Sequence, residues 1–522
     1  MNELKQTTIA GIVLLLKDAQ VRADLAAMTA AGGCITVLQQ KVAALEALIQ
    51  SDSDGAINKF NEILDFLAGL DDSEALTLET MLAAKANAVH THSKSEITDF
   101  EHTHDDRYYT EEEIQNLLSG YFTKQAGEEL QALVGRHGRR LNALEAIVPA
   151  MNDALPTTYT LEADSNPAFT RVNSGAAERY IQAMGGYMWY KKDNVWYAAK
   201  LNSSSWDTFA DGTPVTTAIE NACETMIHTP ECHYLGNGKT MTFGGLQPVA
   251  GGHTFAAPKW NGAYLGSVGS DNKLHSRPNT TPAYSRTMTE FWNRAQALDT
   301  NAGLSNYQFH CLINALYQAR YGNLNYQATV GSGWQHSDWE HCRDVAMGLT
   351  KTLGDGTGKV LYNDATVGNQ YPTKLFGFED LCTKLWEFRP GIRFYMDGDV
   401  RHAVVYDGNV VSNTATGRDI SGVLASASGQ YANQMELGEY WDMIAKAVSG
   451  SDTTYYCDGY WAATGGDLLS VGGIASCLAR CGLSFANSNS GFSISGTDIG
   501  ARLAFYGEPE IVSGAELVAM IS

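Results

Sequence analysis

The fold is decided near the C-terminus, where residues 469–505 read LSVGGIASCLARCGLSFANSNSGFSISGTDIGARLAF. Gly472 and Gly473 permit a backbone turn that side chains would block. An alternation of apolar residues near the end of this stretch predicts a strand with one buried face: Ile499, Ala501, Leu503 and Phe505. Between the turn and the strand, residues 474–497 are mostly small or polar and have little to bury. We therefore predict that they form a displayed surface.

Residues after Pro156 have the texture of a globular domain, because aromatic residues, Gly and Asn become frequent there. One helix is clearly predicted in this part. It follows the N-cap candidates Ser305 and Asn306 and stops at residues 322–323, which are Gly and Asn. The opposite side of this helix is largely polar, and one face is apolar: Phe309, Leu312, Ile313, Leu316 and Ala319.

Three strings of this domain are similar to a known fold. Residues 306–325 (NYQFHCLINALYQARYGNLN) and 374–388 (KLFGFEDLCTKLWEF), with the ending quoted above, resemble the C-type-lectin fold of phage variable proteins and of the sulfatase-modifying-factor group. Phe376 stands where those families have Ile or Leu, and Ala501 where they have an aromatic residue. The resemblance implies an α+β, C-type-lectin-like (sulfatase-modifying-factor-like) C-terminal domain. We interpret Glu379 and Glu387 in the second string as hydrogen-bonding residues inside the fold; the alternative is a carboxylate pair for glycan hydrolysis, which sequence alone does not show.

In the variable proteins that this ending resembles, diversity-generating retroelements rewrite the corresponding segment by adenine-directed mutagenesis. Asn codons mutated in this way never give Lys, Glu, Gln, Met or Trp, and residues 474–497 contain none of these five. A loop that is merely rich in Ser and Asn would have the same alphabet. The resemblance therefore implies a variable segment at about residues 472–502. Its candidate ligand-contact residues are Ile474, Ser476, Leu478, Arg480, Phe485, Asn487, Asn489, Ser493 and Ser495.

Four aromatic residues before this segment are candidate anchors for a ligand. Tyr and Trp supply a large contact area at a low cost in conformational entropy, as in antibody paratopes. These anchors are Tyr455, Tyr456, Tyr460 and Trp461.

The main alternative function is enzymatic. Formylglycine-generating oxidases share the resembled fold and use a closely spaced Cys pair near the C-terminus, where this chain has Cys477 and Cys481. Two thiolates can bind a soft metal such as copper(I). However, the pair lies inside the proposed variable segment, and the Arg-rich flanks usual in that family are not evident. We therefore expect a binding protein and no enzyme, with most of the nine cysteines reduced, buried and structural.

The first third of the chain has the pattern of a segmented coiled coil. Apolar residues at steps of three and four form short seams within residues 35–49, 57–67 and 130–148, and Pro149 ends the last one. Any one of these seams is equally typical of an amphipathic helix in a globular domain. Together they favour a trimeric fibre stalk, in which partner chains stabilise helices too short to be stable alone.

Two His-x-His pairs lie between the second and third seams. In an extended chain residues i and i+2 point the same way, so each pair presents two imidazoles to one point. Three chains around a threefold axis would supply six nitrogens, which suits iron or another divalent transition metal. Residues 97–111 (ITDFEHTHDDRYYTE) resemble a repeat of tailed-phage long tail fibres that binds metal in this way, although solvated loop histidines remain the alternative. The candidate ligands are His90, His92, His102 and His104.

Charge and hydropathy limit the class of partner. The formal net charge is −22, from 58 acidic and 36 basic residues, so a phosphate backbone would be repelled and nucleic acid is not expected as a partner. The apolar run at residues 12–16 is too short to span a membrane and lacks a signal-peptide pattern. We expect synthesis in a bacterial cytoplasm and no membrane insertion. A bacterial surface adhesin, which would need a secretion signal or lipid anchor, is the third reading.

These observations predict a tail fibre in four parts. Residues 1–85 are a helical and coiled-coil region for tail attachment, residues 86–125 the His-x-His segment, residues 126–155 a short coiled coil, and residues 156–522 the receptor-binding domain. We expect a homotrimer in the virion that contacts phage tail or baseplate proteins at one end. A bacterial surface protein or glycan would be the ligand at the other.

Overall fold

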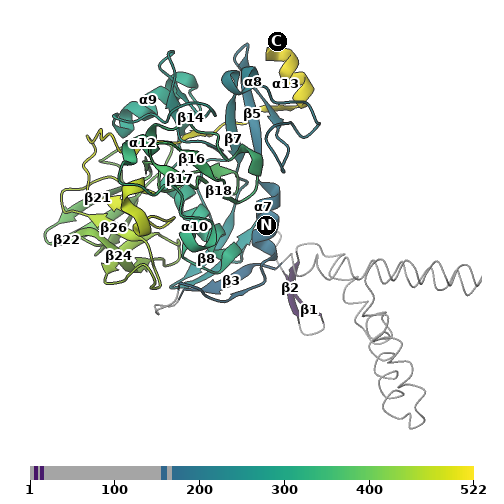
Figure 1. Cartoon of the computed structure of the whole chain (residues 1–522). Helices are drawn as coiled ribbons and strands as arrows, with labels where there is room; N and C mark the ends of the chain where they lie inside the picture. Colours follow the sequence, from purple (N-terminus) through teal and green to yellow (C-terminus); the bar gives the residue numbers. More distant parts are fainter. Residues whose placement is uncertain (1–4, 10–11, 17–154, 162–166, 522) are drawn as a thin grey trace, which may run out of the picture. The chain divides into compact units, whose positions relative to one another are not determined.

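The computed structural model describes residues 5–9, 12–16, 155–161 and 167–521, and a thin grey trace marks the others in Figure 1. Contacts divide the chain into two compact units, residues 1–123 and 124–522. The predicted coiled-coil seams lie outside the described residues. So do the four histidines of the predicted metal site: His90, His92, His102 and His104.

The described part of the first unit is an antiparallel hairpin of β1 (Lys5–Ile9) and β2 (Ile12–Leu16), with Ile9 opposite Ile12. These strands are rich in Thr, Ile and Val, whose branched side chains favour extended backbone. The hairpin falls in the region predicted to be helical, and at its two strands the chain is extended instead.

The described part of the second unit is α+β, with many strands and few helices. Its first large sheet has seven strands in the order β14-β30-β11-β7-β5-β6-β31. Neighbours are antiparallel except β31, which runs parallel to β6. The strands are β14 (Ala302–Leu304), β30 (Leu503–Phe505), β11 (Trp260–Gly262), β7 (Glu224–His228), β5 (Gly185–Lys192), β6 (Val195–Lys200) and β31 (Glu510–Val512).

The second large sheet also has seven strands, in the order β25-β24-β26-β28-β27-β20-β29. Two of its pairs, β26 with β28 and β20 with β29, are parallel. The strands are β25 (Ile444–Val448), β24 (Ala427–Glu436), β26 (Gly459–Ala462), β28 (Ala486–Ser488), β27 (Ser470–Val471), β20 (Trp386–Phe388) and β29 (Ile499–Gly500). The C-terminal part of the chain supplies most of this sheet.

Smaller sheets complete the unit. A five-stranded sheet contains β10 (His253–Thr254), β8 (His233–Asn237), β9 (Thr240–Gly245), β3 (Thr157–Thr160) and β4 (Arg171–Val172). Two three-stranded sheets contain β21 (Ile392–Asp397), β22 (Val400–Val405) and β23 (Arg418–Ser421), and β15 (Gly358–Lys359), β18 (Thr373–Leu375) and β19 (Phe378–Glu379). Two-stranded pairs are β12 (Ser267–Val268) with β13 (Leu274–His275), and β16 (Tyr362–Asp364) with β17 (Gly368–Gln370).

The helices of the second unit are mostly short. In Figure 1 the C-terminal helix α13 and strand β26 lie at opposite sides of the unit. The α-helices are α7 (Gly175–Ala183), α8 (Thr217–Ala222), α9 (Met288–Leu298), α10 (Tyr307–Tyr321), α11 (Tyr326–Thr329), α12 (Trp339–Asp344) and α13 (Gly514–Ile521). Two 3₁₀ helices are η1 (Lys351–Leu353) and η2 (Ala475–Arg480).

Helix α10 is the helix predicted from the sequence. Its N-cap is Asn306, whose side chain accepts a hydrogen bond from Phe309 N at 2.9 Å, and its C-cap is Gly322 in the left-handed region. The polar face of this helix is buried as well as its apolar face. Gln318 Oε1 on this face accepts hydrogen bonds from the Tyr159 hydroxyl and the Trp441 indole.

The predicted strand at residues 499–505 is present as two strands in different sheets. β29 belongs to the second large sheet and β30 to the first, so the residues between them join the two sheets. One of them is Arg502, which is fully buried, so the prediction of a single buried face is wrong. Its guanidinium pairs with both carboxylate oxygens of Glu387 at 2.9 and 3.0 Å and donates to the carbonyls of Gly262, Ala263 and Glu379.

Glu379 and Glu387 lie inside the fold, as predicted. Glu387 accepts hydrogen bonds from Arg502 and Arg389, and these two guanidinium groups keep the pKa of its carboxyl below the usual value despite complete burial. Glu379 accepts from the backbone of Gly348 and from both the backbone and hydroxyl of Thr350. Both carboxylates therefore hold loops and strands together.

Candidate ligand-binding surface

The turn at Gly472 and Gly473 starts the candidate surface segment, residues 474–497. Both glycines have positive φ, of 96° and 78°. A Cβ on Gly472 would lie 2.6 Å from the Leu381 carbonyl oxygen, and one on Gly473 would lie 2.5 Å from the ring of Phe485. Glycine is therefore required at both positions, as the sequence predicted.

The first part of the segment is η2, which projects side chains outward. Leu478 is 50% exposed and has φ 52° and ψ −126°, a backbone conformation that residues other than glycine rarely adopt. The Gln327 side chain holds this turn, because its Nε2 donates to the carbonyls of Leu478 and Cys481, each at 2.8 Å. Ser476 and Arg480 are partly exposed, whereas Ile474 is 9% exposed and packs inward.

The middle of the segment returns to the interior as β28. Phe485 is fully buried, with its ring 4.6 Å from that of Trp386 and against the backbone of Gly459 and Gly473. Asn487 is 9% exposed and pairs with β26 and β27. The expectation that Phe485 and Asn487 lie on the displayed surface is therefore wrong. Both faces of β28 are buried, and the Phe485 ring beside it packs closely against Gly459, Gly473 and Trp386.

The last part of the segment is exposed again and alternates in character. Asn489, Ser493 and Ser495 are exposed, whereas Phe492 and Ile494 are half-buried and pack against the core. Two hydrogen bonds hold its end: Arg343 Nη1 donates to the Thr497 carbonyl at 3.1 Å, and Ser285 N donates to the Gly496 carbonyl at 3.1 Å. This part is thus anchored from inside while its small polar side chains face solvent.

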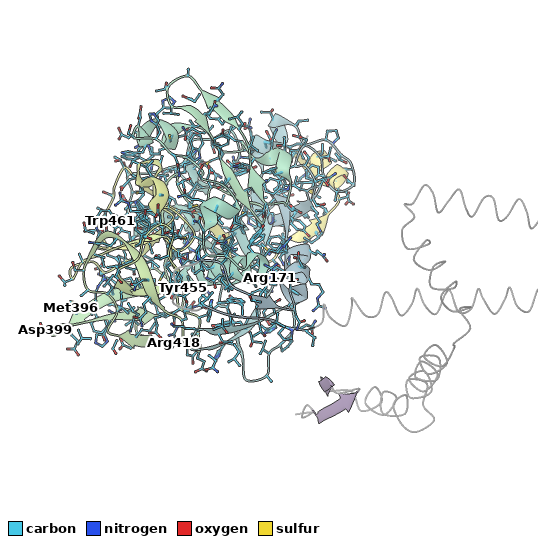
Figure 2. All side chains as sticks on the ribbon, turned by 60° about the horizontal axis from the view of Figure 1, so that its bottom comes forward. Arg171, Met396, Asp399, Arg418, Tyr455 and Trp461 are labelled. Carbon is cyan, nitrogen blue, oxygen red and sulfur yellow. The ribbon has the colours of Figure 1, made fainter. Side chains whose placement is uncertain are left out.

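The predicted aromatic anchors divide in the same way. Tyr455, Tyr456 and Tyr460 are at most 4% exposed, so the structure places these three in the core and not on the surface. Tyr455 and Tyr456 pack edge to face with ring centroids 4.5 Å apart. Trp461 is partly exposed, and Figure 2 shows it at the margin of the unit, with Tyr455 further inside. Aromatic residues serve a core as readily as a binding surface, and sequence alone does not separate the two uses.

Trp461 and Arg480 lie together over a residue that sequence reasoning missed, Gly429 of β24. A Cβ on Gly429 would lie 2.7 Å from Trp461 Cζ2 and 3.0 Å from Arg480 Nη1. Gly429 also has positive φ and interrupts the pairing of β24 with β26. A glycine within a long alternating strand is a signal for such a close approach.

Asp458 lies under the segment as a buried carboxyl. It is 3% exposed, accepts a hydrogen bond from Ser484 N at 2.9 Å, and fills the space where a side chain at Gly482 would stand. Burial raises the pKa of this carboxyl to about 7. The acid form of Asp458 therefore persists well above its ordinary range, and its charge depends on pH near neutrality.

Cys477 and Cys481 are brought together by η2. Cys477 is partly exposed and Cys481 is buried, and the Cys481 thiol is within hydrogen-bonding reach of the Cys477 sulfur and of the Ile474 carbonyl. Contact with the Cys481 thiol lowers the pKa of Cys477 to about 7, whereas burial raises that of Cys481. The other described cysteines are free and buried, as predicted: Cys223, Cys232, Cys311, Cys342, Cys382 and Cys457.

Among the residues that the structure describes, no group of three or more His, Cys, Asp or Glu side chains is arranged to hold a metal ion. Within the same residues, no helix is both long enough and apolar enough to cross a membrane.

Neither a protein-family profile nor a curated protein sequence matches the chain. Among solved structures, one titled "Major Tropism Determinant U1 Variant" is similar to it, with 16% sequence identity and a TM-score of 0.23. The match covers 62% of this chain and 72% of that chain. A TM-score this low carries no argument about the fold or the function.

Proposed function

We propose that this chain is the receptor-binding protein of a bacteriophage tail fibre and that it adheres to a bacterial surface ligand. The contact surface would be the outward side of residues 474–497 together with Trp461, on a C-type-lectin-like domain. One observation carries the proposal: at the end of the segment Asn489, Ser493 and Ser495 face solvent while Phe492 and Ile494 pack against the core. Such a surface can vary in chemistry without disturbing the support beneath it.

The residue types at the first part of this surface suit binding. Trp and Arg are enriched among the residues that contribute most to binding at protein interfaces. Here Trp461 and Arg480 lie side by side, and Leu478, two residues before Arg480 in η2, is half exposed. Gln327 and the glycine turn hold the backbone of this part in one conformation. Less conformational entropy is therefore lost when a ligand binds. The segment's sequence resemblance to phage variable proteins supports the same reading.

Binding of the labelled chain to susceptible bacteria tests the proposal. Trp461→Ala and Arg480→Ala should each weaken the apparent Kd roughly tenfold or more, as expected for central interface residues. Ile511→Ser is the matched control, because Ile511 is 61% exposed on β31, outside the proposed surface. Unchanged binding by both surface variants, with the control also unchanged, would reject this surface.

The oxidase reading rests on Cys477 and Cys481, which lie within reach of each other. A Cys477→Ser, Cys481→Ser double variant that binds cells normally would discard it. The adhesin reading differs in location: antibodies against the chain should label virions if it is a tail fibre and the bacterial envelope if it is an adhesin. A near-copy of the DNA encoding residues 472–502 beside a reverse transcriptase gene would support variability of the segment.

A further inference from the structure

The two cysteines of η2 differ in every property that governs thiol reactivity. Cys477 is partly exposed at the surface, and Cys481 is 1% exposed directly behind it. Both are tied to Ile474: Cys477 N donates to the Ile474 carbonyl at 2.9 Å, and Cys481 Sγ lies 3.4 Å from the same oxygen. The Cys477 sulfur is therefore accessible to reagents in solution, and the Cys481 sulfur is held within reach of it.

The backbone between the two cysteines adopts an unfavourable conformation. Leu478 lies between them with φ 52° and ψ −126°, so η2 is kinked there. A Cβ on Gly473 would lie 2.9 Å from Cys481 Sγ, so the buried sulfur is confined from behind and faces Cys477. A sterically confined sulfur next to an accessible one is the arrangement of an attacking and a resolving thiol.

We propose that Cys477 and Cys481 form a reversible disulfide, with Cys477 as the site of thiol–disulfide exchange and Cys481 as the resolving cysteine. The oxidant is a low-molecular-weight disulfide. The Cys477 thiolate attacks one of its sulfurs, the S–S bond breaks, and one small thiolate leaves with the electron pair. Cys481 then loses its proton to solvent and attacks the Cys477 sulfur, and the second small thiolate leaves. Two protein thiols are oxidised and one small disulfide is reduced.

Oxidation would change the exposed turn of the candidate surface. The new bond closes a short loop around Leu478, and it restricts the backbone that also carries Arg480. Thiols remain reduced in a bacterial cytoplasm and oxidise outside it, so the segment would be made in one state and used in the other. This consequence for binding rests on the proposed function, whereas the disulfide itself does not.

Alkylation of the full chain tests the first half of the proposal. Reduced protein is treated briefly with iodoacetamide, digested, and mapped by mass spectrometry. At pH 7 Cys477 should be modified roughly tenfold or more faster than any other described cysteine, because only its thiolate is both exposed and populated. In Cys481→Ala the pH at which the Cys477 rate is half-maximal should rise, since the hydrogen bond from position 481 is lost. Equal rates at all cysteines would overturn the proposal.

Exchange with glutathione disulfide tests the second half. The native chain should yield a peptide pair joined through Cys477 and Cys481, and Cys481→Ser should accumulate the Cys477–glutathione mixed disulfide instead. Cys342→Ser is the control: its cysteine is buried in another cluster, and the variant should form the disulfide like the native chain. A mixed disulfide that persists in the native chain, or no reaction at Cys477, would overturn the assignment.

Cell binding by the oxidised and reduced chains separates this inference from the proposed function. A disulfide that forms while neither state binds cells would leave the redox pair established and reject the receptor-binding proposal. Binding that is unaffected by Trp461→Ala but present in both redox states would reject the proposed surface alone.

Discussion

At the scale of single residues, the buried carboxyl of Asp458 links the candidate surface to pH. Its pKa of about 7 in the folded state lies above the ordinary value of about 4 for an unfolded chain. Between these values the folded state binds more protons than the unfolded state, so the contribution of Asp458 to stability falls as the pH rises from about 4 to 7. Above pH 7 the loss is complete.

Asp458→Asn should remove this pH dependence, because the amide keeps an acceptor for Ser484 N and does not ionise. The free energy of unfolding of the variant relative to the native chain should rise by on the order of 2 kcal/mol between pH 5 and pH 8. Urea denaturation of both proteins at the two pH values measures this double difference, which cancels other titrating groups. A difference that is the same at both pH values would show that Asp458 is ionised throughout.

Arg502 joins the two large sheets, because it bonds Glu387 of β20 and the carbonyl of Gly262 of β11. Removing one partner of a buried ion pair leaves the other charge unpaired, which costs about 3–5 kcal/mol. Arg502→Met should therefore lower the free energy of unfolding by about that amount, because Glu387 would keep only its bond from Arg389 and the carbonyls of Gly262, Ala263 and Glu379 would lose their donor. The control is Arg320→Met, which breaks a half-exposed pair with Glu178 and should cost less than about 1 kcal/mol. Similar losses in both variants would contradict the role assigned to Arg502.

At the scale of elements, the sequence predicted what local rules determine. Helix α10 begins and ends where its cap residues Asn306 and Gly322 lie, and the glycine turn at residues 472–473 has the expected positive φ. Local sequence rules did not predict the packing of residues that are distant in sequence. Nothing local distinguishes Phe485 in the core from Trp461 at the surface. The difference arises because Gly459, which is distant in sequence, leaves room for the Phe485 ring.

The same limit explains why the candidate segment was predicted to be exposed along its whole length. Its composition reports small and polar side chains, but small residues also fit closely between strands. Ala486 and Ser488 of β28 are fully buried for this reason. The hydrophobic periodicity did not indicate this burial, because β28 is only three residues long and is buried on both faces.

The kink in η2 gives a prediction at the element scale. Leu478→Gly should raise the free energy of unfolding by roughly 1 kcal/mol, because glycine adopts φ 52°, ψ −126° without strain and the lost side chain is half exposed. Leu478→Ala keeps the Cβ and should not gain this stability. Chemical denaturation of the three proteins measures the difference. An equal loss of stability in both variants would show that the leucine side chain is worth more than the strain.

At the scale of the whole molecule, the proposed fibre makes binding a property of three chains. Several weak sites on one particle raise the apparent affinity by effective concentration, so a shallow surface of serines and one tryptophan can suffice. Such a particle needs a stable axis. We propose that metal ions bound by the two His-x-His pairs, in the region outside the described residues, supply it.

The metal proposal predicts a stoichiometry. Purified under native conditions, the protein should have three times the mass of one chain by light scattering. Each trimer should contain roughly two transition-metal ions, one for each of the two His-x-His positions in the sequence. His102→Ala, His104→Ala should lose half of this metal, whereas His336→Ala, in the second unit, should lose none. Because the ions would join three chains, their removal by a chelator should also lower the temperature at which the trimer dissociates. A trimer that holds no metal and is indifferent to chelation would leave the coiled-coil seams as the sole basis for assembly.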